Sequence, residues 1–272
     1  MTKLKSQVCF LTPNALFPDK PLFIFLPGMD GTGQLLRTQT VGLETGFDVR
    51  CLAIPPDDLT SWDELSKQVV ALVEAELARR PVGQPVYLCG ESFGGCLALK
   101  VALQAPHLFT RIVLVNAASS FHRRPWMLWG GEVIRWFPDF LFEFSAVGLL
   151  PYLAALERIT PEDRRTFLNT IKKIPKATSA WRLSLLKSFE VDDLPLYRLT
   201  QPVLTIASGS DRLLPSIADA RHLVSLLPNA KLFILPNSGH ACLLEKDVNL
   251  YRILQEQDFL PQVNVDSLTS VK

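Results

Sequence analysis

Short runs of consecutive apolar residues alternate along this chain with longer segments in which apolar residues recur every three or four positions. Continuous apolar runs of about five residues are typical of buried parallel strands, whereas the longer spacing predicts helices with one apolar face. The runs that predict strands are residues 22–26, 47–54, 85–89, 111–115, 202–207 and 230–235. This alternation predicts an α/β fold with a mostly parallel central sheet flanked by helices.

The clearest helical pattern covers residues 61–80, where Ser61 is a predicted N-cap and Glu64 occupies the capping-box position. Pro81 ends that helix because it cannot continue the hydrogen-bonding pattern. Further helices are predicted over residues 93–104 and 216–227.

Residues 117–190 interrupt the alternation because they contain no clear strand. They hold four of the five tryptophans and seven of the sixteen phenylalanines, and eleven basic and seven acidic residues give them a net charge of +4. Because this segment lies between two predicted core strands, we expect a helical lid above the carboxyl edge of the sheet. The predicted organisation is a core of residues 1–116 and 191–262, a lid of residues 117–190 and a flexible tail of residues 263–272.

Residues 90–94 read Gly-Glu-Ser-Phe-Gly and match G-x-S-x-G between a predicted strand and a predicted helix. In this context the serine sits on a strained turn from which its hydroxyl projects, and the flanking glycines allow close backbone packing. The following helix N-terminus also favours a developing oxyanion. We therefore predict Ser92 as a nucleophile; the alternative is a glycine-rich packing turn.

A serine hydroxyl needs a base, and the chain offers four histidines. His107 follows a predicted helix, His122 opens the lid, and His222 lies on a predicted amphipathic helix with its side chain towards solvent. His240 follows the last predicted strand, from where it can reach back over the sheet edge. His240 is therefore the predicted base.

The acid is expected on the loop after the penultimate strand, which places Asp211 in the chain order serine, acid, histidine. Its carboxylate would hold the imidazole in one tautomer and stabilise the imidazolium. The alternative is an N-cap role for Asp211, although Ser216 suits that cap better. Asp192 and Asp193 precede the strand and are weaker candidates.

Two backbone N–H groups should face the oxyanion. We assign one to Phe93, directly after the nucleophile, and the other to Met29 in the glycine-rich loop 27–33. The same loop could be a phosphate cradle, but it lacks both glycine-rich nucleotide-binding patterns.

Composition and charge limit the partners, metals and cofactors that we expect. With 28 basic and 27 acidic residues the net charge is +1, which argues against nucleic acid as a partner. The five cysteines, an odd number without C-x-x-C, lie among apolar residues and are expected to be buried reduced thiols. No His/Cys cluster has ligand spacing, so we predict no metal and no cofactor.

The sequence has no secretory signal pattern and no apolar run of about 18 residues that would span a membrane. We expect a cytoplasmic protein. The positive lid would favour peripheral contact with an anionic membrane, which would be the thylakoid in a photosynthetic organism; the alternative is a solvated surface.

The motifs together resemble the α/β-hydrolase superfamily from about residue 23 to residue 245. The segments that carry the resemblance are residues 26–33, 90–95, 208–215 and 237–240. More narrowly, Pro-Gly-Met-Asp-Gly-Thr at residues 27–32 and Val-Asn-Ala-Ala-Ser-Ser-Phe at residues 115–121 resemble the hydrolase part of the plant and cyanobacterial phytyl ester synthase family. The resemblance implies the α/β-hydrolase fold, with Ser92, Asp211 and His240 as a catalytic triad.

The resemblance also implies a hydrophobic ester substrate with a long acyl or phytyl-like prenyl group, cleaved through an acyl-enzyme. The plant synthases carry a further acyltransferase-like domain, and neither that domain nor an H-x(4)-D motif occurs in this sequence. We therefore expect hydrolysis. The alternatives are acyl transfer to an alcohol by the same triad, a non-catalytic small-molecule-binding member of the fold, and a cofactor-free haloperoxidase or C–C hydrolase.

Four lid aromatics, Trp126, Trp129, Phe140 and Phe142, are the candidates to line the substrate site or touch a membrane. The alternative for each is a place in the lid's own core.

Overall fold

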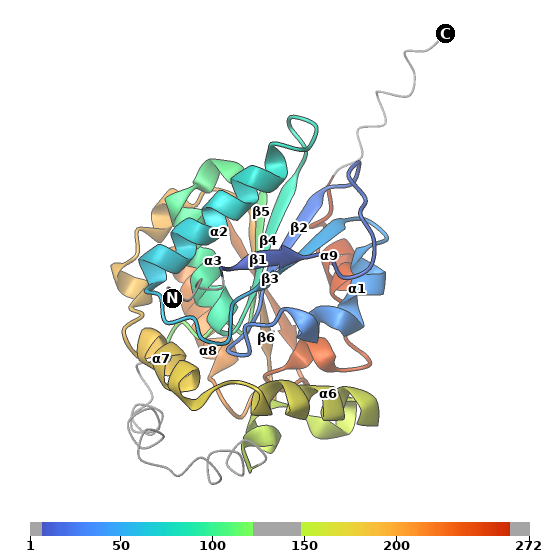
Figure 1. Cartoon of the computed structure of the whole chain (residues 1–272), viewed down its shortest axis with the longest axis vertical. Helices are drawn as coiled ribbons and strands as arrows, with labels where there is room; N and C mark the ends of the chain where they lie inside the picture. The colour runs from blue at the N-terminus through green and yellow to red at the C-terminus, as the bar shows by residue number, and fades with distance from the viewer. Residues whose placement is uncertain (1–6, 122–147, 262–272) are drawn as a thin grey trace, which may run out of the picture.

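A seven-stranded sheet forms the centre of the computed structural model, which describes residues 7–121 and 148–261 (Figure 1). The strand order is β1-β3-β2-β4-β5-β6-β7, and every neighbouring pair is parallel except β1 with β3. The strands are β1 (Cys9–Leu11), β2 (Leu22–Leu26), β3 (Asp48–Ala53), β4 (Val86–Glu91), β5 (Arg111–Val115), β6 (Val203–Ser208) and β7 (Ala230–Leu235). All six predicted strands are therefore confirmed as one mostly parallel sheet.

The sequence pattern did not predict β1, because a three-residue edge strand is too short to produce a recognisable apolar run. Its position also corrects one expectation about the cysteines. Cys9 is exposed on this edge strand, whereas the other four are buried, and all five are free thiols.

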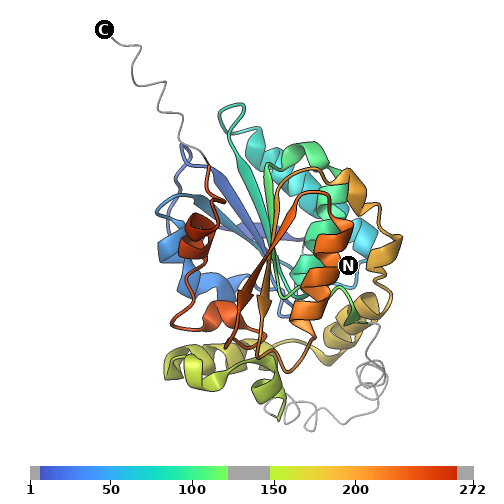
Figure 2. The same cartoon turned by 180° about the vertical axis from the view of Figure 1, so that it is seen from behind.

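Helices cover both faces of the sheet (Figures 1 and 2). The α-helices are α1 (Arg37–Leu43), α2 (Trp62–Leu77), α3 (Phe93–Gln104), α6 (Pro161–Lys172), α7 (Lys176–Lys187), α8 (Ser216–Leu226) and α9 (Leu250–Glu256). Short 3-10 helices are η1 (Gln34–Leu36), η2 (Pro106–Leu108), η4 (Leu156–Arg158), η5 (Val191–Asp193), η6 (Leu196–Arg198) and η7 (Cys242–Leu244). The predicted helices 61–80, 93–104 and 216–227 are confirmed as α2, α3 and α8, and the Ser61 hydroxyl caps α2 by accepting from the Glu64 N–H.

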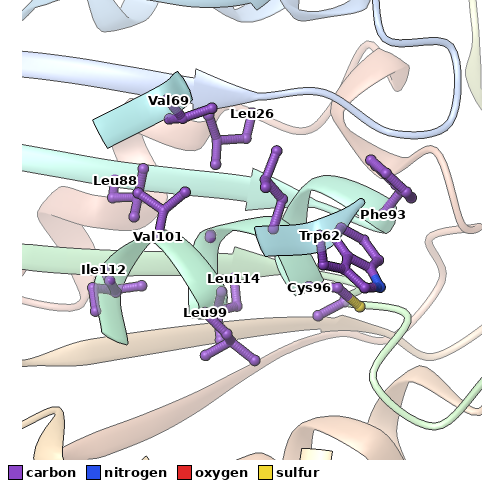
Figure 3. Close-up of a cluster of buried hydrophobic side chains, with 14 of the residues drawn as sticks. Leu26, Trp62, Val69, Leu88, Phe93, Cys96, Leu99, Val101, Ile112 and Leu114 are labelled. Atoms are coloured by element: carbon purple, nitrogen blue, oxygen red, sulfur yellow. The ribbon is translucent and has the colours of Figure 1, made fainter. Parts of the chain in front are cut away.

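The alternating side chains of β2 show how the two core layers form. Ile24 and Leu26 pack under α2, α3 and α8, while Phe23 and Phe25 pack on the other face, which α1 and α9 cover. In the first layer Trp62 of α2 stacks on Phe93, the first residue of α3, with ring centroids 4.6 Å apart (Figure 3). This apolar contact fixes the N-terminus of α3, where the candidate nucleophile lies.

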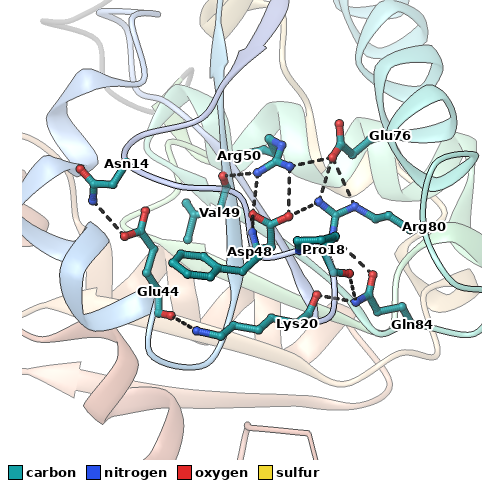
Figure 4. A network of polar contacts seen from close by, with 11 residues as sticks. Asn14, Pro18, Lys20, Glu44, Asp48, Val49, Arg50, Glu76, Arg80 and Gln84 are labelled. Atoms are coloured by element: carbon teal, nitrogen blue, oxygen red, sulfur yellow. Dashed lines mark hydrogen bonds and ion pairs between the residues drawn. The ribbon is translucent and has the colours of Figure 1, made fainter.

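A buried polar cluster lies at the opposite end of the sheet, where β3 begins (Figure 4). Arg50 bonds Asp48 at 2.8 Å and Glu76 at 2.9 Å, and Arg80 bonds the same two carboxylates. Burial raises the pKa of Asp48, but the two arginines outweigh it and hold that pKa below its usual value. The carboxylate therefore stays ionised, and the cluster joins β3 to α2 as structure, remote from the strand ends that carry the candidate site.

A helical insertion separates β5 from β6 and lies at the carboxyl end of the parallel strands (Figures 1 and 2). Its described part holds a helical turn at residues 148–153, then η4, α6 and α7, and it contains no strand. The domain limits at residues 117 and 190 stay a prediction, and the tail of residues 263–272 lies outside the described residues. Over the described part of the chain, no helix is both long enough and apolar enough to cross a membrane.

Candidate active site

Ser92 lies on the tight turn between β4 and α3, with φ of 53° and ψ of −113°. A positive φ is strained for a serine and persists only where the surroundings enforce it. Backbone bonds do so here: the Ser92 N–H donates to the Val115 carbonyl at 2.9 Å. Its own carbonyl accepts from Gly95 at 2.9 Å and from Ala118 at 3.2 Å.

The two glycines of the motif are required by close backbone contacts. A Cβ on Gly90 would lie 2.2 Å from the Gly94 carbonyl oxygen, and a Cβ on Gly94 would lie 2.1 Å from the Leu26 carbonyl oxygen. No side chain fits at either position, because real Cβ atoms do not approach other atoms this closely. The two glycines of the G-x-S-x-G pattern are therefore needed because the backbone of this turn packs tightly on itself and against the end of β2.

His240 joins the serine to an acid in one chain of hydrogen bonds. Its Nε2 lies 2.8 Å from Ser92 Oγ, and its Nδ1 lies 2.7 Å from Asp211 Oδ2. A proton on Nδ1 would be held by the carboxylate, which leaves Nε2 free to accept the hydroxyl proton. The structure therefore brings together the three side chains that the sequence singled out, although they lie on the ends of three different strands.

The charges in the series Asp211, His240 and Ser92 favour an ionised carboxylate on Asp211 and a basic imidazole on His240. Burial lowers the pKa of His240, but the charge and hydrogen bond of Asp211, with a further contribution from Glu91, outweigh that effect and raise the pKa. Burial raises the pKa of Asp211, but His240, Ser216 and the Leu214 N–H outweigh it and lower the pKa. The carboxylate therefore stays charged and increases the proton affinity of the imidazole.

Asp211 is held by the turn that follows it. Its Oδ1 accepts from the N–H groups of Leu213 at 2.8 Å and Leu214 at 2.9 Å, and its Oδ2 accepts from the Ser216 hydroxyl as well as from His240. The expectation that Ser216 caps the next helix is wrong, because Pro215 is the N-cap of α8 and makes no side-chain cap. The Ser216 hydroxyl instead orients the carboxylate.

Asn116, directly after β5, is a supporting residue whose role the sequence did not reveal. Its φ of 44° is unusual for a residue other than glycine. Its Nδ2 donates to the His240 carbonyl at 2.7 Å and to Ser208 Oγ at 2.8 Å, and its Oδ1 accepts from the Ser208 N–H. Asn116 thereby ties the histidine loop to the ends of β5 and β6.

Glu245 is a second such residue and is 1% exposed. Its carboxylate accepts from the Gly239 N–H at 2.7 Å, from Ser238 Oγ at 2.9 Å and from Arg158 Nε at 2.5 Å. Arg158 belongs to η4 of the insertion, so one buried carboxylate joins the histidine loop to the lid segment. The sequence gives no signal for this role, because Glu245 begins the charged run Glu-Lys-Asp at residues 245–247, which is typical of an exposed loop.

The loop after β2 lies against the nucleophile, because a Cβ on Gly28 would be 3.9 Å from Ser92 Cβ. Phe93 is the buried first residue of α3. Within the described residues, the backbone N–H groups of Met29 and Phe93 donate no hydrogen bond. No protein acceptor among the described residues therefore competes for these two N–H groups, and their role as oxyanion donors stays a prediction.

Glu91, inside the motif, adds a carboxyl group beside the imidazole. Burial raises its pKa to about 7, with His240 opposing and Asp30 adding to that rise. Burial also raises the pKa of Asp30, against hydrogen bonds from Thr32 and the charge of Arg182. The negative charge near His240 is therefore smaller at neutral pH than the number of carboxyl groups suggests.

The remaining candidates lie elsewhere. His107 is exposed in η2, and His222 on α8 bonds Asp192 with its Nε2 2.6 Å from the carboxylate oxygen. Within residues 7–121 and 148–261, no group of three or more His, Cys, Asp or Glu could hold a metal ion. Five candidates lie outside the described residues: His122, Trp126, Trp129, Phe140 and Phe142.

Comparison with known proteins identifies relatives of this sequence and of its fold. The sequence model of the α/β-hydrolase fold family matches residues 62–247. The chain is 34% identical over 262 residues to phytyl ester synthase 1, chloroplastic, of Arabidopsis thaliana, across 87% of this chain and 37% of that protein. It is 28% identical over 248 residues to a pimeloyl-(acyl-carrier protein) methyl ester esterase of Aromatoleum aromaticum, across 82% of this chain and 92% of that protein. The chain thus spans little more than a third of the plant relative.

Among solved structures, a lipase-esterase related protein from Clostridium acetobutylicum superposes with a TM-score of 0.73 at 17% identity. The superposition covers 94% of this chain and 100% of that one. At this identity the likeness concerns the fold.

Proposed function

Because the chain belongs to the α/β-hydrolase fold family, we propose that it is a serine hydrolase that cleaves carboxylic esters, with Ser92, His240 and Asp211 as its catalytic triad. The observation that carries the proposal is the unbroken hydrogen-bond chain from Asp211 through His240 to Ser92 Oγ. A serine on a strained turn, a buried imidazole of raised pKa and an ionised carboxylate together form an activated nucleophile.

In the proposed reaction His240 Nε2 takes the proton of Ser92 as Oγ attacks the ester carbonyl carbon. The N–H groups of Met29 and Phe93 stabilise the resulting oxyanion. The imidazolium then gives its proton to the departing alcohol, which leaves an acyl group on Ser92. Water attacks this acyl-enzyme with His240 as base again, and the acid is released.

For the substrate we propose an ester with a long apolar acyl or phytyl-like group. Support comes from the likeness to a plant phytyl ester synthase, whose name states a phytyl ester, and from the helical insertion over the strand ends. The net charge of +4 on residues 117–190 supports peripheral contact of this insertion with an anionic membrane.

A second candidate is acyl transfer to an alcohol in place of water, and the synthase named among the relatives favours it. The same triad performs both reactions, because only the group that attacks the acyl-enzyme differs. The ratio of acid to new ester formed with a long-chain alcohol present decides between them.

The test is labelling with a fluorophosphonate, followed by hydrolysis of p-nitrophenyl esters of increasing chain length. Wild type and Ser92→Ala are compared, with Ser184→Ala as a control because Ser184 is an exposed serine on α7. We expect wild type and the control to be labelled and to prefer long chains, while Ser92→Ala does neither at an unchanged melting temperature.

Labelling with a preference for acetate or butyrate would keep the triad and remove the long-chain substrate. Absence of labelling in the wild type would overturn the hydrolase proposal and favour a ligand-binding role.

A further inference from the structure

We propose that Arg182, on helix α7 of the insertion, is a positioning residue for the oxyanion loop: it holds the Met29 carbonyl so that the Met29 N–H faces the reacting oxygen. The inference rests on the proposed hydrolase function. It makes the insertion part of the machinery that stabilises the oxyanion, in addition to a cover over the site.

The contact is short and buried. Arg182 Nη1 donates to the Met29 carbonyl oxygen at 2.6 Å, and Arg182 is 2% exposed. A Cβ on Gly31 would lie 2.5 Å from Arg182 Nη1 and 2.9 Å from its Cζ, so the guanidinium lies directly against the backbone of this loop. The glycine at position 31 therefore provides the space that the arginine occupies.

The loop is fixed at its other end by backbone bonds. The Gly31 N–H donates to the Gly28 carbonyl at 3.0 Å, and the Ile54 N–H donates to the Gly31 carbonyl at 2.7 Å. Asp30 accepts from the N–H and the hydroxyl of Thr32. The Gly31–Gly28 bond holds the peptide group that carries the Met29 N–H, and the Arg182 bond holds the next peptide group, which carries the Met29 carbonyl. The two bonds act on either side of the Met29 Cα, so loss of the Arg182 bond would free the Met29 backbone to rotate and misdirect its N–H.

Burying the Arg182 guanidinium costs free energy unless its charge and its N–H groups find partners. Burial lowers its pKa, and Asp30 and Asp58 oppose that effect. A buried cation needs a compensating carboxylate and hydrogen-bond acceptors, and the compensating charge of Asp30 comes from the same loop. Charge and the shorter hydrogen bond therefore connect Arg182 to residues 29–31, while its Nη2 makes a longer bond, 3.4 Å, to the Pro55 carbonyl.

A role in docking α7 is the alternative, and other contacts already provide it. The Thr178 hydroxyl donates to the Pro56 carbonyl, Trp181 Nε1 donates to the Thr60 carbonyl at 2.9 Å, and Trp62 Nε1 donates to the Leu185 carbonyl at 2.8 Å. These bonds attach α7 to residues 56–62 without touching the oxyanion loop. Positioning and docking can therefore be separated by mutation.

The experiment compares Arg182→Gln and Arg182→Lys with Trp181→Phe, which removes a docking bond one residue away. For each we would measure kcat and KM on a p-nitrophenyl ester, the melting temperature, and the Ki of a trifluoromethyl ketone, whose tetrahedral adduct needs the oxyanion donors. Loss of one such donor costs about 10²–10³-fold in kcat, and a misaligned donor retains part of its effect. For Arg182→Gln we expect kcat to fall about 30-fold with little change in KM.

We expect the ketone Ki to rise by the same factor as kcat/KM falls, because both report binding of the tetrahedral state. Arg182→Lys should recover part of kcat, since its ammonium can still donate to the Met29 carbonyl. Trp181→Phe should lower the melting temperature while kcat stays within about twofold of wild type, because its single lost bond does not touch the oxyanion loop.

Equal losses of kcat in Trp181→Phe and Arg182→Gln, or an unchanged ketone Ki, would overturn the positioning role. If Arg182→Gln does not fold, Arg182→Lys is compared with Arg182→Met, which cannot donate a hydrogen bond. Wild-type kcat and Ki in both of these variants would overturn the inference. A wild type that is neither labelled nor active would remove the proposed function and this inference together. An active wild type matched by every Arg182 variant would remove this inference alone.

Discussion

Ser92 Oγ and His240 Nε2 lie 2.8 Å apart, yet the two residues are held in place by different kinds of contact. Backbone contacts enforce the serine turn, where glycines 90 and 94 leave no room for a side chain. Side chains enforce the histidine loop, chiefly Asn116, which lies 124 positions from His240, and Glu245, which also binds Arg158 of the insertion, 87 positions away. Backbone packing demands particular residues at fixed spacing, whereas a side-chain network can be assembled from anywhere in the chain. The first arrangement therefore leaves a motif in the sequence and the second does not.

The largest expected effect comes from Asp211→Asn, which breaks the side-chain network at its acid. The amide favours the wrong imidazole tautomer, so kcat should fall about 10⁴-fold, as in other triads. The acid limb of the pH profile of kcat/KM should also move to lower pH. Asp211 raises the pKa of His240 against the lowering effect of burial, and only neutral imidazole acts as base.

In wild type the acid limb of kcat/KM should therefore lie above the ordinary histidine pKa of about 6.5, and in Asp211→Asn it should shift to lower pH. The measurement is kcat/KM against pH for both proteins. An acid limb that does not move would mean that Asp211 is not the partner that sets this pKa.

The next largest effect should come from Gly94→Ala, which disrupts the close backbone packing of the serine turn. Its Cβ would collide with the Leu26 carbonyl, and we expect the free energy of unfolding to fall by about 3 kcal/mol. Urea denaturation measures this, with Gly148→Ala as the control because a Cβ there meets nothing within 4 Å. Equal stability of the two variants would show that the turn does not depend on close backbone packing.

Glu245→Gln should have an intermediate effect, because it keeps the size of the side chain but removes its charge. The amide cannot accept from Ser238, Gly239 and Arg158 together, so we expect a loss of about 2 kcal/mol in stability. A displaced histidine loop should lower kcat about tenfold. Glu256→Gln is the control, since Glu256 pairs with Arg252 on the exposed face of α9. Wild-type kcat in Glu245→Gln would restrict Glu245 to a purely structural role.

The smallest effect is expected for His222→Gln. His222 also bonds an aspartate, but its side chain is 29% exposed where that of His240 is 8% exposed. Exposed ion pairs contribute at most about 1 kcal/mol, so stability should change by less than that and kcat should stay at the wild-type value. A large loss of activity here would mean that a histidine–aspartate pair matters wherever it lies, which would weaken the contrast with His240.

The sequence by itself determined the fold class, the six parallel strands, the three main helices and the residues of the candidate triad. It could do so because buried strands need continuous apolar runs, and because the strained serine turn excludes side chains at two fixed positions. The edge strand β1 and the seven-residue helices α1 and α9 escaped prediction because short elements carry too little pattern.

Only the tertiary structure decided which polar residues support the site. Asn116, Arg158, Arg182 and Glu245 reach it from the ends of separate elements, and Ser216 turned out to orient Asp211 instead of capping a helix. Their hydrogen bonds join residues up to 153 positions apart, as Arg182 and Met29 are. No local periodicity or spacing encodes such contacts, because they exist only after the sheet has brought the carboxyl ends of its strands to one edge.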